Sequence, residues 1–182
     1  MVAVTSLPPS PQPQSVAADI WQAYEAELGP VCAFLRRCGA RDAADLAHDT
    51  FMVAFQRRAT FEKGRPLRPW LFGIALGLWR NQQTKASSVR ETDAPLPEVA
   101  DLSPSLDESL EQRRRREALA RVLERLDTDQ RVAFVWHDIE ERPVAELAEN
   151  LGVPTNTIYS RLRIARQKVN AAFAAQARKE VS

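Results

Sequence analysis

The chain has 182 residues, enough for one medium-sized domain or two small ones, each with its own core. Its formal net charge is +1, so net charge alone points to no nucleic-acid partner. The longest apolar run, residues 70–79, is shorter than the ~20 residues that a membrane span needs, and residues 1–15 lack the pattern of a signal peptide. We therefore expect a soluble, cytoplasmic protein that does not enter a membrane.

The cysteines and histidines do not have the spacing of a metal site. Cys32 and Cys38 fall in one predicted helix, where six residues separate the two Cα atoms by about 9 Å, too far for a disulfide. His48 and His137 are distant in the sequence, and no nucleophile–base arrangement or phosphate-binding loop accompanies them. We predict buried free thiols, no metal, no cofactor and no enzymatic activity.

Helical spacing of apolar residues dominates the first half of the chain. Residues 1–15 are rich in Pro, Ser and Gln and predict a disordered N-terminal tail. Three helices are predicted, the first bent at Gly29-Pro30 and the third preceded by a loop: 19–37, 41–58 and 67–85. Because no segment alternates like a β-strand, residues 16–86 predict an all-α domain of three helices.

Charge is distributed in blocks, although the total is near zero. Residues 57–90 carry eight Lys or Arg and one acid, whereas residues 91–112 carry seven acids and no base. Pro, Ser and Asp are frequent in residues 87–107, which predicts a flexible acidic linker there. Two basic domains on an acidic tether would produce this pattern.

The second half predicts another all-α domain, over residues 108–178. Two helices come first, over about 106–126 and 128–139. The basic run 113–116 alternates with acids, which favours a solvated, salt-bridged face over a DNA contact. Either Asp127 or Thr128 can cap the N-terminus of the second of these helices.

Residues 143–168 predict two short helices joined by a tight turn. The apolar faces are formed by Val144, Leu147, Ala148 and Leu151 in the first helix and by Ile158, Leu162, Ala165 and Val169 in the second. Gly152 and Pro154 end the first helix. Residues 155–179 hold six bases and no acid, which suits a phosphate backbone. We favour a DNA-binding helix-turn-helix, with an ordinary helical hairpin as the alternative.

The predicted helix over 67–85 has more apolar surface than a small domain needs. One stripe holds Leu67, Leu71, Ile74 and Leu78, and a second holds Phe72, Leu76 and Trp79. Either the helix is sandwiched, or some aromatics serve a partner. Phe61 and Trp70 lie close in sequence to several bases, an arrangement typical of single-stranded nucleic-acid sites, in which bases stack on rings. Taken residue by residue, membership of the core is favoured for these aromatics, and the surrounding bases keep the nucleic-acid interpretation open.

The motifs occur in the order known from one protein family. They are AADLAHDTF (43–51), RPWLFGIA (68–75), Gln130-Arg131, VAELA (144–148), GVP (152–154), TIYSRL (157–162) and Ala165-Arg166. Together they resemble bacterial RNA polymerase sigma factors of the sigma-70 family, specifically the extracytoplasmic-function (ECF) group. The resemblance covers about residues 19–175 and implies a region 2-like domain followed by a region 4-like domain.

The resemblance implies that the chain binds core RNA polymerase and selects promoters. The first domain would melt and read the single-stranded −10 element, and the second would read the duplex −35 element. An anti-sigma factor is a further candidate partner. Polymerase contact would fall to Asp45, His48, Asp49 and Phe51. The −10 contacts would fall to Phe61, Lys63, Arg65, Arg68, Trp70 and Arg80.

Helix-turn-helix geometry assigns the −35 contacts. The groove-facing residues are predicted to be Asn156, Tyr159, Ser160 and Arg163. Among them, Arg163 can bond guanine, Asn156 can bond adenine, and Tyr159 can contact a thymine methyl. The predicted phosphate contacts are Thr155, which can also cap the helix, and Arg161, Arg166 and Lys168.

The sequence departs from the family pattern at three positions. Gly77 stands where the family usually has Asn, Asn81 where it has Asp, and His48 where it has Gln. A glycine inside a helix needs a reason such as close packing. The alternative function is a helix-turn-helix regulator that acts on duplex DNA without being a polymerase subunit, and a third is an adaptor that binds polymerase or an anti-sigma factor without reading promoters.

Overall fold

The computed structural model describes residues 14–62, 64–89 and 110–180, and every regular element in these residues is helical. The elements are α1 (Gln14–Cys38), α2 (Ala43–Gln56), a 3₁₀ turn η1 (Arg58–Thr60), α3 (Leu67–Val89), α4 (Leu110–Leu123), α5 (Thr128–Phe134), a π-helical turn η2 (Val135–Ile139), α6 (Val144–Leu151) and α7 (Thr155–Glu180). The predicted all-α class is confirmed. Most of the predicted tail and most of the predicted linker lie outside the described residues, and Gln14 and Ser15, the last two residues of the predicted tail, are helical because α1 begins there.

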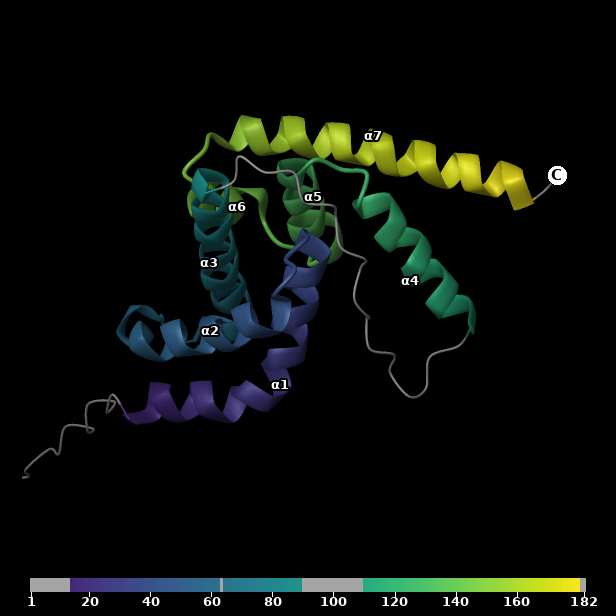
Figure 1. The fold of residues 1–182 in the computed structure, drawn as a ribbon. Coiled ribbons are helices and arrows are strands. Elements are labelled where there is room, and N and C mark those ends of the chain that lie inside the picture. Colours follow the sequence, from purple (N-terminus) through teal and green to yellow (C-terminus); the bar gives the residue numbers. More distant parts are fainter. Residues whose placement is uncertain (1–13, 63, 90–109, 181–182) are drawn as a thin grey trace, which may run out of the picture.

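Helices α1 to α3 form the first domain. Figure 1 shows α1 bent into two arms, the first lying along α2 and the second rising toward α5. Pro30 lies inside this helix, where it lacks an N–H and its ring clashes with the preceding turn, which accounts for a bend. The helix ends at Gly39, whose φ of 103° only glycine adopts freely.

Helices α4 to α7 form the second domain and contain the predicted helix-turn-helix. Gly152 has a φ of 63° and follows α6 directly, while the Val153 N–H donates to the Ala148 carbonyl at 3.1 Å. The predicted inner face of α7 is buried: Ile158, Leu162, Ala165 and Val169. The turn and both apolar faces therefore lie where the spacing of the residues places them.

Several element boundaries differ from the prediction. Helix α3 continues through Val89, into the first residues of the predicted linker. Asp127 occupies the N-cap position of α5, but its side chain makes no capping hydrogen bond. Its carboxylate instead lies 3.5 Å from the Lys168 Nζ, a partner 41 residues away that local sequence cannot reveal. The α5 helix also widens into a π-helical turn from Val135.

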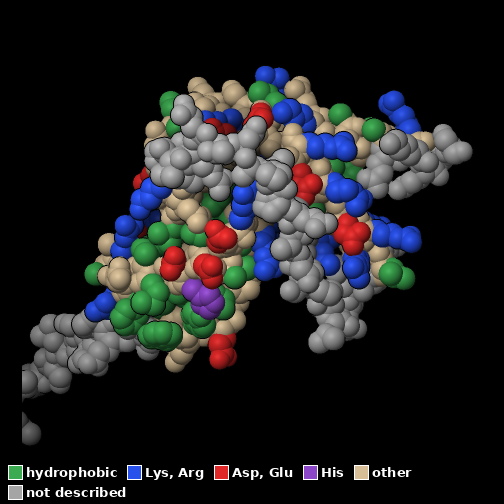
Figure 2. Space-filling model, in the orientation of Figure 1, with side chains coloured by type: hydrophobic (Ala, Val, Ile, Leu, Met, Phe, Trp, Pro, Cys, Tyr) green, Lys and Arg blue, Asp and Glu red, His purple; other side chains and the backbone are tan. Residues whose placement is uncertain are grey.

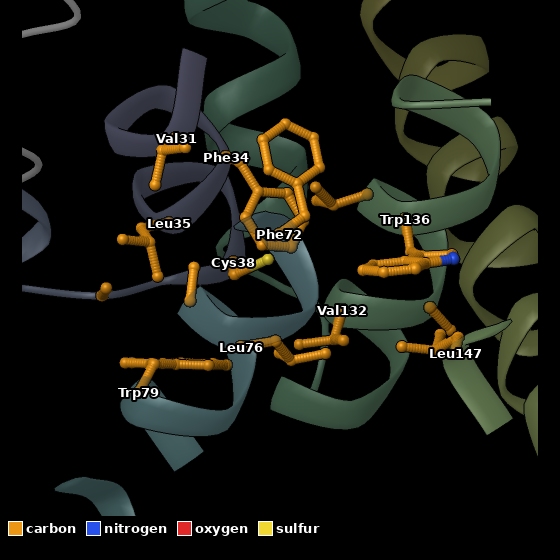
Figure 3. Packing of buried hydrophobic residues seen from close by; sticks show 14 of the residues in the cluster. Val31, Phe34, Leu35, Cys38, Phe72, Leu76, Trp79, Val132, Trp136 and Leu147 are labelled. Atoms are coloured by element: carbon orange, nitrogen blue, oxygen red, sulfur yellow. The ribbon is translucent and has the colours of Figure 1, made fainter. Parts of the chain in front are cut away.

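The two domains share one hydrophobic core. The rings of Phe34 in α1 and Phe72 in α3 stack with centroids 4.3 Å apart, and Trp136 of the second domain meets Phe34 edge-on at 6.1 Å. Figure 3 shows Phe72 and Leu76 on the side of α3 that faces Val132, Trp136 and Leu147. The second apolar stripe of α3 is therefore core, and the helix is sandwiched.

Polar contacts at the C-terminus of α1 lie beside this shared core. The Arg131 guanidinium donates to the carbonyls of Arg37 at 2.5 Å and of Arg36 at 3.4 Å, and Arg37 pairs with Glu140. Burial lowers the pKa of Arg131. Burial also raises the pKa of Glu140, although the positive charge of Arg37 acts in the opposite direction on that carboxyl. Arg37 and Glu140, which are partly buried, therefore form an ion pair between the two domains, and removal of either charge would leave the other without its partner.

Neither cysteine forms a disulfide. Cys38 is buried, which raises the pKa of its thiol, and Cys32 is half-buried. Within the described residues, no cluster of His, Cys, Asp and Glu could hold a metal ion. No helix in the described part of the chain is both long and apolar enough to cross a membrane.

We predict that Leu71→Ala destabilises the protein by about 2–5 kcal/mol, because the Leu71 side chain is fully buried in α3. Met52→Ala, at an exposed position of α2, is the control and should change the free energy of unfolding by less than about 0.5 kcal/mol. Urea unfolding followed by circular dichroism measures both. Similar stabilities of the two variants would contradict the assigned core.

Candidate nucleic-acid and polymerase interfaces

The outer face of α2 presents three of the four predicted polymerase contacts. Asp45, His48 and Asp49 are exposed on one helical stripe, which Met52 extends with 59% of its surface exposed. The Tyr24 hydroxyl lies 2.6 Å from His48 Nδ1 and fixes the orientation of that ring. Figure 2 shows acidic side chains around a histidine beside a hydrophobic patch on this face. The surface thus combines negative charge with apolar area.

Phe51 does not belong to this surface. It is only 5% exposed and meets Tyr24 of α1 edge-on, with ring centroids 4.9 Å apart. The prediction that it contacts polymerase is wrong, because it lies on the buried stripe of α2 with Ala47 and Ala54. The prediction also missed Trp21, which is 61% exposed and lies 6.0 Å from the Phe55 ring.

Three of the predicted −10 residues meet in one hollow of about 630 Å³ between the two domains. The rings of Phe61 and Trp70 lie 5.1 Å apart, and both are half-buried. Arg65 is exposed beside them and pairs with Glu62 at 2.7 Å, while Arg57 lines the same hollow. Stacking surfaces and cations are therefore within reach of one nucleotide strand.

The other predicted −10 residues lie elsewhere. Arg68 lines a separate hollow, where it donates two hydrogen bonds to the Glu27 carboxylate, at 2.6 and 3.1 Å, and these raise the pKa of its guanidinium. Arg80 lies ten residues beyond Trp70, about 15 Å further along α3. The structure does not bring either residue to the aromatic pair, and Lys63 lies outside the described residues. The Glu27 pair spans 41 residues, so local sequence does not reveal it.

The two glycines of α3 differ in their surroundings. A Cβ at Gly77 would meet nothing within 4 Å, so the expectation that close packing explains this glycine is wrong. A Cβ at Gly73 would lie 3.0 Å from Asn150 Oδ1, on α6 of the other domain. The other domain therefore comes close to α3 at Gly73, in the wall of the 630 Å³ hollow, a closeness that the sequence did not reveal.

The predicted groove-facing residues of α7 form one exposed stripe. They are Asn156, Tyr159, Ser160 and Arg163, and Tyr159 is 57% exposed. Arg163 makes no ion pair with any described residue. Thr155 is the first residue of the helix and is also exposed. These side chains present donors, acceptors and one aromatic ring to the solvent without competing intramolecular charge pairs.

The predicted phosphate contacts are bound to acids of the same domain. Arg161 lies 2.5 Å from Asp129, and Lys168 lies 3.5 Å from Asp127 and donates to the Gln130 side-chain oxygen at 2.9 Å. Arg166 donates twice to Asp138, at 2.9 and 2.5 Å, and this carboxylate raises the pKa of Arg166. In the free chain these three cations hold α7 against α5 and η2, so a phosphate would have to replace their present partners.

Two family descriptions match the two domains. "Sigma-70 region 2" matches residues 23–89 and "Sigma-70, region 4" matches residues 116–169. The sigma factor CnrH of Cupriavidus metallidurans is 29% identical over 146 residues, which are 76% of each chain. The ECF sigma factor SigE of Mycolicibacterium smegmatis is 30% identical over 132 residues, 70% of this chain but only half of SigE.

Solved structures of sigma factors resemble the whole fold. The sigma factor RpoE, in complex with the anti-sigma factor NepR from Bartonella quintana, matches with a TM-score of 0.69 and 26% identity over 86% of this chain and 97% of RpoE. CnrH in complex with the cytosolic domain of CnrY matches with a TM-score of 0.56 and 25% identity, over 90% of this chain and 95% of CnrH.

The order of the two regions, their match to both family descriptions and the shared fold lead to one conclusion. The chain belongs to the ECF group of the sigma-70 family. Members of this family are transcription initiation factors that direct RNA polymerase to promoters.

Proposed function

We propose that this sigma factor binds core RNA polymerase and starts transcription at promoters whose −10 and −35 elements it reads with its two domains. The observation that carries the proposal is the pair of separate surfaces: the exposed stripe of α7 and the hollow that holds Phe61 and Trp70. The first suits the edges of duplex bases, and the second suits stacked bases of a single strand. A regulator that binds only duplex DNA would need the exposed stripe of α7 but not the hollow.

The outer face of α2 is the proposed polymerase contact. Asp45 and Asp49 supply negative charge, and Met52 with Trp21 supplies apolar area that a partner can bury. Charge on the rim of such a surface speeds association, while the apolar centre gives most of the affinity.

The two DNA surfaces cannot work together in the closed arrangement. Thr155 follows Asn150 by five residues, so their Cα atoms are at most about 19 Å apart, and Asn150 lines the same hollow as Phe61. Elements centred at −10 and −35 lie about 25 base pairs apart, or about 85 Å of straight duplex. Polymerase must therefore separate the domains, and residues 90–109 could span at most about 70 Å between them.

We also propose an anti-sigma factor as a partner. RpoE and CnrH, which resemble this chain over most of their lengths, were both solved in complex with such factors. A sigma factor held by an inhibitor stays off the polymerase until a signal releases it, which fits a chain whose two DNA surfaces are drawn together.

Run-off transcription with purified core polymerase and genomic DNA fragments tests the proposed function. We expect promoter-specific transcripts that require this chain, whereas the chain alone should bind duplex DNA weakly because its net charge is only +1. Tight sequence-specific binding by the chain alone, without transcripts, would support the regulator alternative instead.

Arg163→Ala and Arg166→Ala should differ in kind. Loss of Arg163 should cost about 1–3 kcal/mol of discrimination at one −35 base pair and leave the melting temperature unchanged, because Arg163 has no ion pair to lose. Loss of Arg166 should weaken all promoters alike and lower stability by up to about 1 kcal/mol, since it breaks an exposed pair with Asp138. Transcription from a promoter library and thermal melting measure both, and identical promoter profiles would refute the assignment.

Phe61→Ala should lower strand opening more than it lowers stability. A stacking contact is worth about 1–3 kcal/mol, and Phe61 is only half-buried, so its truncation should cost less stability than Leu71→Ala. Permanganate reactivity of promoter thymines reports opening, and thermal unfolding reports stability. Normal opening in a destabilised Phe61→Ala protein would assign this ring to the core alone.

A further inference from the structure

The hollow that holds Phe61 and Trp70 has a second wall, which comes from the helix-turn-helix domain. Opposite the aromatic pair lie Arg142 and three residues of α6: Glu146, Glu149 and Asn150. In Figure 1, α3 rises from α2 toward α6, which brings the two walls together. The first helix of the helix-turn-helix therefore covers a surface of the other domain.

The two walls come close together at Gly73. A Cβ there would lie 3.0 Å from Asn150 Oδ1 and 3.4 Å from its Nδ2. A glycine inside a helix costs roughly 1 kcal/mol relative to alanine, and at Gly73 it leaves room for α6. Gly77, one turn further along, has nothing within 4 Å, so the close approach is confined to the turn of α3 that lines the hollow.

The wall from α6 is acidic. The Arg142 Nη2 donates to both carboxylate oxygens of Glu146, at 3.1 and 3.0 Å. Glu149 is exposed and makes no ion pair within the described residues. On the facing wall lie the cations Arg57 and Arg65, of which Arg65 already pairs with Glu62 at 2.7 Å. A carboxylate offers these cations the same kind of charged oxygen as a DNA phosphate, and it repels a phosphate that approaches the hollow.

We propose that α6 is an autoinhibitory wall, which closes the −10 strand site of the free chain with its acidic edge. The inference rests on the proposed function of the hollow as that site. Glu146 and Glu149 oppose a nucleotide strand until the domains separate on polymerase. Because α6 also belongs to the helix-turn-helix, one movement frees the −10 hollow and releases the −35 reader.

The full-length chain without polymerase provides the test. Fluorescence anisotropy measures its binding to a labelled 12-nucleotide oligothymidine at low salt. We expect the double variant Glu146→Gln, Glu149→Gln to bind about three- to tenfold more tightly than the unchanged protein. Two negative charges are removed from the hollow, and Arg142 loses its carboxylate partner and becomes available to a phosphate. Unchanged melting temperatures establish that the two Gln substitutions, one at half-buried Glu146 and one at exposed Glu149, leave the fold intact.

A charge-matched control separates a local effect from net charge. Glu117→Gln with Glu124→Gln removes two exposed acids outside the hollow and should change the affinity less than twofold. Adding Phe61→Ala to the Glu146→Gln, Glu149→Gln variant should abolish its increase in affinity, because the bound oligonucleotide would stack on the Phe61 ring.

Two outcomes would overturn the inference, and they can be told apart. If the Glu146→Gln, Glu149→Gln variant and the unchanged protein bind oligothymidine equally, and both depend on Phe61, then α6 does not inhibit and the −10 site stands. If no variant binds in a Phe61-dependent way, the strand site itself is wrong and the autoinhibitory wall falls with it.

Discussion

Packing of Trp136 against the Phe34–Phe72 pair is the interaction on which the arrangement of this protein depends. It joins a ring of the second domain to a stacked pair from two helices of the first, with less than 2% of each side chain exposed. Beside it, Arg131 donates to the last carbonyls of α1, and Arg37 pairs with Glu140. An apolar contact with these partly buried polar partners beside it favours one relative placement of the domains, because a shifted placement would break the Arg37–Glu140 pair and the Arg131 hydrogen bonds.

This shared core determines how much free energy is needed to separate the two domains. Separation of the domains exposes the faces of Phe72 and Leu76 and breaks the Arg131 hydrogen bonds, so the free chain favours the closed arrangement. A partner can open the chain only if it binds the open form more tightly by at least that difference in free energy. On the proposed function, polymerase would supply part of this free energy through α2, and the promoter would supply the rest through the two DNA surfaces, whose elements lie far apart.

The sequence predicted what local patterns determine. Spacing of apolar residues placed the buried face of α7, and Gly152 marked the turn before it. The outer stripe of α7, from Asn156 to Arg163, follows from the same periodicity. Phe51 was misassigned because its family motif spans both faces of α2, and only the helical stripe separates the buried position from the exposed ones.

What could not be predicted depends on residues distant in the sequence. Arg68 is held by Glu27, and Arg166 by Asp138, over 41 and 28 residues. The second apolar stripe of α3 left two interpretations open, since its partners Val132 and Leu147 lie beyond the linker. For the same reason no local signal distinguished Gly73, which touches Asn150, from Gly77, which touches nothing.

The central claim is that the free chain is closed and that polymerase opens it. The most direct measurement is the distance between two spin labels, one on Gln56→Cys in α2 and one on Asn170→Cys in α7, which are both exposed positions. The substitution Cys32→Ser removes the half-buried native thiol, so that the remaining native cysteine is the buried Cys38. Double electron–electron resonance should give one narrow distance distribution for the free chain. With core polymerase and promoter DNA, that distance should lengthen by tens of ångströms, as elements about 85 Å apart require. The same distance distribution in both states would contradict the account.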